Sequence, residues 1–424
     1  MTTLKPPPRI ARKRSEAVNA ELVLPSHGLT ILAYYNQASR TDRFKTSERR
    51  DHYRELGFGF FGEVGGLLSA LKKGKRDQLT PPQAQVVGEE LGDALWYLVN
   101  MAALSGLDVE ELAKAGLQFL RQHFDEQPKV SPSGLTFKAL DGIAAQHHLQ
   151  LSRQGDSPLR MLAKDSGEIV VRDLRDVLAD RGNDRGQTFG RLLGELALVS
   201  ARHGLRLELI AHENLKKIAD RWPGDNPRHE HLQMHGEPHE QLPSKMEVLF
   251  TQRKVGNRIV VVQQMKGVNI GDPLTDNSHR PDGYRFHDVF HLAYAVHLGW
   301  SPVIRALLKL KRKSDPRIDE NEDGARAIII EEGIATWIFN HSARQSPKHY
   351  AAVVEGRLDY ALLKTVRGMV SGFEVADLPL WQWERAIVEG FRVFRLLLEN
   401  KGGTVEADLR KRTLTYKPPA ATAP

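Results

Sequence analysis

Acidic residues with helical spacing occur in two neighbouring segments near the N-terminus. Glu90 and Asp93 lie three residues apart in GEELGDALWYL, so a helix there would project both carboxylates from one face. Glu63, in the preceding segment GFFGEVGGLLSALKKGK, can supply a third carboxylate from a facing helix. Magnesium prefers oxygen ligands and keeps coordination positions for substrate phosphates. The spacing therefore predicts a Mg²⁺ (or Mn²⁺) site for a phosphorylated substrate, against the alternative of two solvated acidic helix faces.

The order of these motifs resembles the MazG-like all-α nucleoside triphosphate pyrophosphohydrolases. The resemblance rests on Glu-Val-Gly at Glu63, the Lys72–Lys73 pair, the Glu-Leu-Gly-Asp-Ala-Leu-Trp-Tyr-Leu run, and an upstream LTILAYYNQASRTDRF that is similar to that family's first helix. It implies cleavage of a nucleoside triphosphate to a monophosphate and pyrophosphate. It also implies that Glu63, Glu90 and Asp93 are the catalytic metal ligands and that Lys72 or Lys73 meets the phosphates.

One position departs from the family pattern. Gly66 stands where the second glutamate of the first acidic pair is expected. The predicted metal shell therefore has one ligand fewer, which leaves two functions open for this half: a weakened pyrophosphohydrolase, or a non-catalytic nucleotide sensor.

The composition favours a cytoplasmic protein that acts on small anions. The 424 residues are 41% hydrophobic and 27% charged, which is ordinary for a globular protein with two or three cores. No apolar run approaches the length of a membrane span or of a signal segment. The absence of cysteine excludes disulfides and thiolate metal sites. The excess of 60 Lys and Arg over 53 Asp and Glu is spread along the chain, which fits a nucleotide substrate better than nucleic acid or a membrane.

A helix–turn–helix pattern occurs twice. Placing Gly106 on Gly204 superposes a series of Leu, Ala and Glu positions, although two amphipathic hairpins can look alike without common descent. In the second copy Asn214, Lys217 and Arg221 fall at i, i+3 and i+7, on one helix face. The resemblance implies that these residues contact the nucleotide. It also implies a homo-oligomer, unless the internal duplication replaces a partner subunit.

The expected fold is mainly α, with a MazG-like helical bundle and a helix-rich C-terminal α+β domain that contains a small antiparallel sheet. Two hairpins are predicted, in MEVLFTQRKVGNRIVVVQQM and GGTVEADLRKRTLTY, and EIVV within the insertion is predicted as a short strand. The expected ranges are a disordered basic tail (1–24), MazG-like helices (25–125), an insertion (126–184), further MazG-like helices (185–225), the C-terminal domain (226–417) and a disordered tail (418–424).

Histidines in the C-terminal half suggest a second site. His287 and His291 lie one helical turn apart in DGYRFHDVFHLAYAVHLGW, with Asp288 beside them, and a distant segment carries Glu331 and Glu332. A metal site of His287, His291 and Glu332 would make this half a metallohydrolase that the bundle regulates. The alternative is a buried, hydrogen-bonded cluster without a metal.

Overall fold

The computed structural model describes residues 28–45, 48–76, 83–127, 133–180, 182–224, 227–232 and 237–419. The basic tail expected at 1–24 and most of the C-terminal tail lie outside these residues. The chain divides into two compact units, Met1–Ala219 and Asp220–Pro424. None of the described helices combines the length and the apolar character that crossing a membrane requires.

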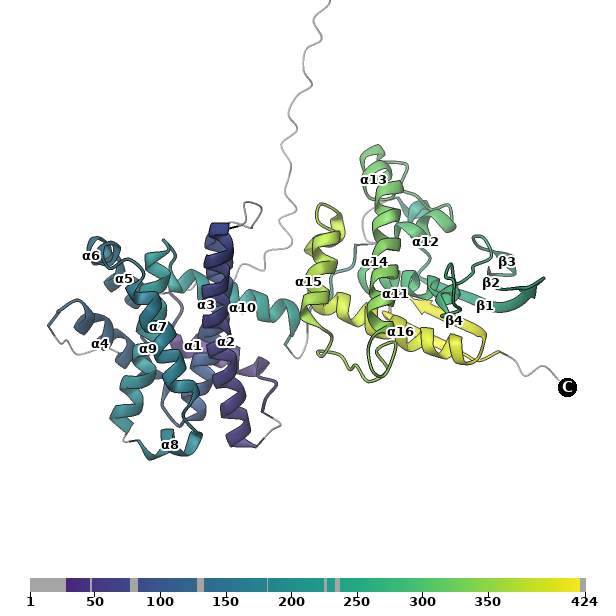
Figure 1. The fold of residues 1–424 in the computed structure, drawn as a ribbon. Coiled ribbons are helices and arrows are strands. Elements are labelled where there is room, and N and C mark those ends of the chain that lie inside the picture. Colours follow the sequence, from purple (N-terminus) through teal and green to yellow (C-terminus); the bar gives the residue numbers. More distant parts are fainter. Residues whose placement is uncertain are drawn as a thin grey trace, which may run out of the picture. The chain divides into compact units, whose positions relative to one another are not determined.

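The N-terminal unit consists of helices and short connections (Figure 1). Its elements are α1 (Ile31–Ala38), η1 (Ser39–Thr41), α2 (Arg49–Arg76), α3 (Gln83–Leu104), α4 (Val109–His123), α5 (Phe137–Gln146), α6 (His148–Arg153), α7 (Ser157–Val170), α8 (Leu174–Ala179), α9 (Gly182–Arg202) and α10 (Leu207–Arg221), the last of which continues into the second unit.

Helices α2 and α3 form the pair that carries the acidic residues, and they lie side by side. The buried stripe of α2 includes Leu56, Phe60, Val64 and Leu67, spaced three or four residues apart, as an amphipathic helix requires. Gly59 allows a close approach of the two helices, because a Cβ atom there would lie 2.2 Å from the Tyr97 ring. The pair therefore has a fixed contact a few residues from Glu63.

The duplicated helix–turn–helix is present. Helices α4 and α10 each have 15 residues and begin 98 positions apart, at Val109 and Leu207. Gly106 and Gly204 both have left-handed backbones, with φ of +82° and +71°. In each turn the residue after the glycine donates its N–H to a carbonyl of the last helical turn, at 3.2 Å in the first copy and 2.9 Å in the second. Helices α3 and α9 thus end with the same type of glycine cap.

The two copies also meet at their beginnings, which sequence analysis did not predict. Thr30 and Thr136 form an isolated antiparallel bridge, with Ile31 N–H donating to Leu135 O and Phe137 N–H donating to Leu29 O. The similar segments Leu-Thr-Ile and Leu-Thr-Phe are therefore paired about an approximate two-fold axis. Helices α1 and α5, which follow these two segments, thus begin side by side.

The segment 126–184, expected as an insertion, lies within the N-terminal unit and supplies α5 to α8. The predicted strand at EIVV is wrong, because α7 continues to Val170. Leu162, Ser166 and Ile169 are buried at helical spacing, and Pro158 occupies the first turn. Packing of this periodic face outweighs the local β preference of Ile and Val.

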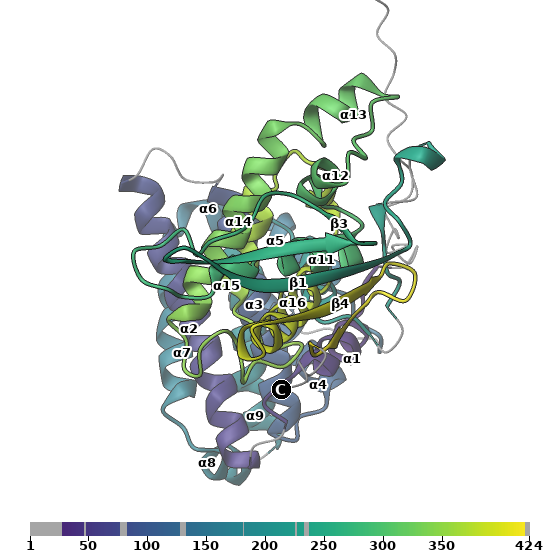
Figure 2. The same cartoon turned by 90° about the vertical axis from the view of Figure 1, so that its right-hand side faces the viewer.

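The C-terminal unit combines helices with one antiparallel sheet of strand order β3-β2-β1-β4-β5 (Figure 2). Its elements are η3 (Pro238–Glu240), β1 (Lys245–Val255), β2 (Arg258–Met265), β3 (Val268–Asn269), η4 (Tyr284–Phe286), α11 (Asp288–Leu298), α12 (Pro302–Leu307), α13 (Pro316–Asn321), α14 (Ala325–Ala343), α15 (Tyr360–Met369), η5 (Glu374–Asp377), α16 (Leu380–Glu399), β4 (Gly402–Asp408) and β5 (Thr413–Lys417). Both predicted hairpins, β1–β2 and β4–β5, and the mainly helical fold class are confirmed.

Helix α11 forms the centre of this unit, since each of its residues is buried. Strand β1 alternates buried and exposed positions, with Met246, Val248 and Phe250 facing the core. Figure 2 shows α11 and α16 behind the strands, and both helices contribute to the core that covers this sheet face. His287, directly before α11, and Asp288 and His291 in its first turn are consequently buried in this unit.

Candidate active site

Helices α2 and α3 bring Glu63 and Glu90 together. Glu63 lies close enough to Glu90 to share a hydrogen bond when one of them is protonated. Gly66, one turn further along α2, faces the same carboxylate: a Cβ atom at this position would lie 2.4 Å from Glu90 Oε2. The position where the family resemblance implies another glutamate is thus directed at the acidic cluster.

Asp93 joins this cluster and is held by the second copy of the repeat. Its Oδ1 accepts a hydrogen bond from Asn214 Nδ2 at 3.0 Å, and its Oδ2 accepts one from Lys217 Nζ. Tyr34 Oη on α1 donates to Asn214 Oδ1 at 2.8 Å, which fixes the orientation of the amide. Gly92 allows this contact, because a Cβ atom there would lie 3.1 Å from the Asn214 Cβ atom. The site is therefore assembled from both copies.

The electrostatics of the cluster favour a bound cation. Burial, followed by the negative charges of Asp93 and Glu90, raises the pKa of Glu63 to about 8, and Lys217 only partly opposes this. Burial together with Glu63 and Asp93 also raises the pKa of Tyr97 to about 12. Three carboxylates face one ammonium group, so the fully ionised set carries an excess negative charge that a divalent ion would neutralise. The all-oxygen carboxylate set fits Mg²⁺ or Mn²⁺.

The other basic residues named from sequence are not all placed at this cluster. Lys72 borders a cavity of about 460 Å³ between α2, α7 and α9. Lys73 is exposed and lies seven residues, or two helical turns, beyond Gly66 on the same face. Arg221 directs its guanidinium to Leu358 O at 3.0 Å and stacks over the rings of Trp222 and Tyr360.

Two residues at the site were missed from sequence. Tyr34 orients Asn214 and lies 180 positions away from it, so no local pattern signals the contact. Tyr97 continues the helix that carries Glu90 and Asp93, one turn after Asp93, and this spacing was an available signal.

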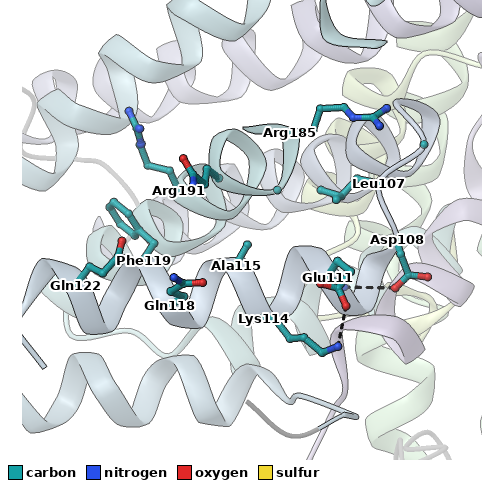
Figure 3. Close-up of a pocket in the computed structure, with 13 residues that line it drawn as sticks. Leu107, Asp108, Glu111, Lys114, Ala115, Gln118, Phe119, Gln122, Arg185 and Arg191 are labelled. Carbon is teal, nitrogen blue, oxygen red and sulfur yellow. Dashed lines mark hydrogen bonds and ion pairs between the residues drawn. The ribbon is translucent and has the colours of Figure 1, made fainter. Parts of the chain in front are cut away.

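The repeat relates the α3–α10 contact to the contact between α9 and α4, and the carboxylate cluster is not reproduced there. At the same 98-residue displacement the counterparts are Thr188 for Glu90, Arg191 for Asp93, Gly116 for Asn214 and Phe119 for Lys217. A cavity of about 660 Å³ lies here, between α4 and α9 (Figure 3). Lys114 in its wall is paired with Glu111, and Arg185 Nη1 donates to Ser105 O. None of these four counterparts is a carboxylate, so the repeat does not duplicate the set formed by Glu63, Glu90 and Asp93.

A second cluster occurs in the C-terminal unit. Among the described residues, His287, Asp288 and His291 place potential metal-ligand atoms within 4.8 Å of one another. Glu332 Oε2 lies 3.6 Å from His287 Nε2 and 3.5 Å from His291 Nε2. The structure thus brings together the three residues of the second site expected from sequence.

The C-terminal unit matches a known family. Residues 228–420 match the family model of the MazG C-terminal domain. The match relates this segment, including the His287 cluster, to the MazG family. It does not extend to the N-terminal unit, where the resemblance rests on the motifs around Glu63 and Glu90. No curated protein and no solved structure matches the chain.

Proposed function

We propose that the N-terminal unit is a metal-dependent nucleoside triphosphate pyrophosphohydrolase. The observation that carries the proposal is the convergence of Glu63, Glu90 and Asp93, with Lys217 from the second copy bound to Asp93. The MazG C-terminal domain in the same chain supports a role of this family. Mg²⁺ or Mn²⁺ held by the three carboxylates would polarise a phosphate and lower the pKa of an attacking water.

The chain's own groups have separate roles in this proposal. Asn214, held by Tyr34, orients Asp93, so that one carboxylate keeps a fixed direction. Lys217 provides positive charge beside the site and can stabilise the charge that develops on the phosphates. Burial and the charges of Asp93 and Glu90 raise the pKa of Glu63, and a cation held beside it would offset these effects and favour the ionised carboxylate.

The test is product analysis with a panel of nucleoside triphosphates, the full chain and Mg²⁺ or Mn²⁺. A monophosphate and pyrophosphate in equal amounts are expected; a diphosphate and inorganic phosphate would contradict the proposed bond cleavage. Asp93→Asn should abolish product. Glu213→Gln is the matched control, since Glu213 adjoins Asn214 but is exposed and paired with Lys216.

A nucleotide sensor is the second candidate, and Gly66 is the observation that favours it. The cluster has three carboxylates where the family resemblance implies four, and fewer charged ligands weaken the hold on metal. Metal-dependent nucleotide binding without product, in the wild-type chain, would identify a sensor. Absence of both binding and turnover would exclude both functions.

A further inference from the structure

We infer that the C-terminal unit contains a centre for a divalent transition-metal ion, formed by His287 Nε2, His291 Nε2, Asp288 Oδ1 and Glu332 Oε2. This site is separate from the carboxylate cluster of the N-terminal unit and does not depend on the proposed function.

The donor atoms have the spacing that one ion requires. His287 Nε2 lies 3.1 Å from Asp288 Oδ1 and 3.6 Å from Glu332 Oε2, and His291 Nε2 lies 3.5 Å from the same Glu332 oxygen. Metal bonds of about 2.0–2.2 Å place neighbouring tetrahedral ligand atoms roughly 3.4 Å apart. A single ion at the centre of these atoms can therefore contact all of them after small side-chain adjustments.

Both imidazoles are oriented by their other nitrogen. His287 Nδ1 lies 2.9 Å from Tyr284 O, and His291 Nδ1 lies 2.8 Å from Glu331 Oε1. In a neutral imidazole, Nδ1 carries the hydrogen and donates it to this oxygen. The other nitrogen, Nε2, then has a free lone pair, which faces the centre of the cluster. Hydrogen bonds of this kind, from a histidine to a carboxylate or carbonyl, are typical of metal-binding histidines.

The carboxylates are held in the same way. Glu331 is fully buried and accepts hydrogen bonds from Ser301 Oγ at 2.6 Å and Val303 N at 2.8 Å, so it stays directed at His291. Asp288 Oδ2 accepts a hydrogen bond from Gln263, which leaves Oδ1 for the centre. These supports come from β2, α12 and the loop before α12, three elements outside the helices that carry the ligands.

The buried Nε2 atom of His291 has only a long contact with the protein. His291 is 0% exposed, and its Nε2 forms no hydrogen bond of good geometry, since Glu332 Oε2 lies 3.5 Å away. A buried polar atom with so weak a partner costs free energy, and native structures seldom tolerate this without a reason. Coordination of an ion would satisfy this atom.

The site is closed on one side and open on the other. The side chains of His287, Asp288 and His291 are nearly inaccessible, whereas that of Glu332 is 39% exposed. An ion can thus enter past Glu332, where a water molecule could also complete the coordination shell. Two imidazoles with two carboxylates suit Zn²⁺, Mn²⁺ or Fe²⁺ better than Mg²⁺, which prefers an all-oxygen shell.

The experiment measures metal in the full chain with Asp93→Asn, so that the N-terminal site does not contribute. The untagged protein is stripped with a chelator and titrated with Zn²⁺, Mn²⁺ and anaerobic Fe²⁺, and the visible spectrum is recorded with Co²⁺. We expect one tightly bound ion per chain and a Co²⁺ spectrum typical of mixed nitrogen and oxygen ligands. Glu332→Gln keeps the side-chain shape and should weaken binding at least tenfold.

Glu389→Gln is the matched control. Glu389 pairs with His297, which lies on α11 like His291 but does not belong to the group of potential metal ligands found among the described residues. This variant should keep the affinity of the parent. A folded parent that binds no ion under any of these conditions overturns the inference, and so does equal affinity in the Glu332→Gln and Glu389→Gln proteins.

Discussion

Gly66 of α2 lies against the carboxylate of Glu90 on α3, so that a Cβ atom added to Gly66 would be 2.4 Å from Glu90 Oε2. This oxygen lies at the end of a flexible side chain and can move. Position 66 is therefore a place where a fourth carboxylate can join the cluster, and its occupation by glycine lowers the negative charge of the site.

The first prediction concerns Gly66→Glu. The variant should be less stable than the wild type without metal, because four clustered carboxylates repel one another. It should bind Mg²⁺ or Mn²⁺ more tightly, so that added metal raises its Tm by more than it raises that of the wild type. Thermal unfolding with and without metal is the measurement. Gly65→Glu is the control, since a Cβ atom at Gly65 has nothing within 4 Å. An equal response of both variants would show that position 66 does not reach the metal.

The second prediction concerns the carboxylates themselves. Glu90→Gln and Asp93→Asn should each remove metal-dependent nucleotide binding while leaving the fold intact, because these half-buried groups contribute charge more than packing. Calorimetric titration with a non-hydrolysable triphosphate analogue checks the affinity, and circular dichroism checks the fold. Unchanged affinity in both variants would exclude this cluster as the nucleotide site.

The third prediction concerns the hydrogen bond between the two copies. Asn214→Ala should lower metal affinity about tenfold, because Asp93 loses the amide that orients it. Tyr34→Phe removes only the hydroxyl that holds this amide and should have a smaller effect in the same direction. If Asn214→Ala retains wild-type affinity, then the second copy serves only as a scaffold for the α2–α3 pair.

The fourth prediction is a pH dependence of stability that arises from Glu195 on α9. Burial, followed by the neighbouring Asp165 carboxylate, raises the pKa of Glu195 to about 9. Neither oxygen has a donor when Glu195 is ionised, whereas a proton on Glu195 can be shared with Asp165. The folded state therefore keeps a proton that the unfolded state releases above its ordinary pKa near 4.5.

This proton linkage lowers the free energy of unfolding as the pH rises from about 4.5 to about 9, by up to about 1.4 kcal/mol per pH unit. Glu195→Gln removes the ionisation and should make the chain more stable at pH 8, with a flatter pH profile. Urea unfolding at several pH values measures both effects. A profile in Glu195→Gln as steep as that of the wild type would contradict the assigned pKa.

Local features of this protein were predictable from sequence, and contacts between distant segments were not. The helices that carry Glu63 and Glu90, and the Gly-Asn turn of the β1–β2 hairpin, follow from periodicity and turn chemistry within short windows. The strand predicted at EIVV failed because burial of one face of α7 decided its conformation.

The limits of prediction from sequence are clearest at the two candidate sites, around Glu90 and around His287. His287 and His291 are one helical turn apart, so the sequence predicted that they converge. The hydrogen bond from Gln263 to Asp288 joins a strand to a helix, and no local pattern predicts it. Likewise, the spacing of Asn214, Lys217 and Arg221 predicted one common face. The structure divides that face, since Asn214 and Lys217 reach Asp93 and Arg221 reaches Leu358 O.

The fifth prediction concerns the contact of α9 with α4, the counterpart of the contact between α3 and α10. A Cβ atom at Gly190 would lie 2.5 Å from Ala115 Cβ and 2.9 Å from the backbone nitrogen of Gly116. Backbone cannot move aside as a side chain can, so Gly190→Ala should separate the helices and destabilise the chain by about 1–3 kcal/mol. Gly186→Ala, one turn earlier on α9, has nothing within 4 Å and should stabilise it by up to about 1 kcal/mol through helix propensity. Denaturant unfolding of the two variants beside the wild type measures both values. Both variants replace glycine by alanine on α9, so they differ only in the contact with α4. Equal changes of stability would therefore show that the close approach of α9 and α4 does not hold in solution.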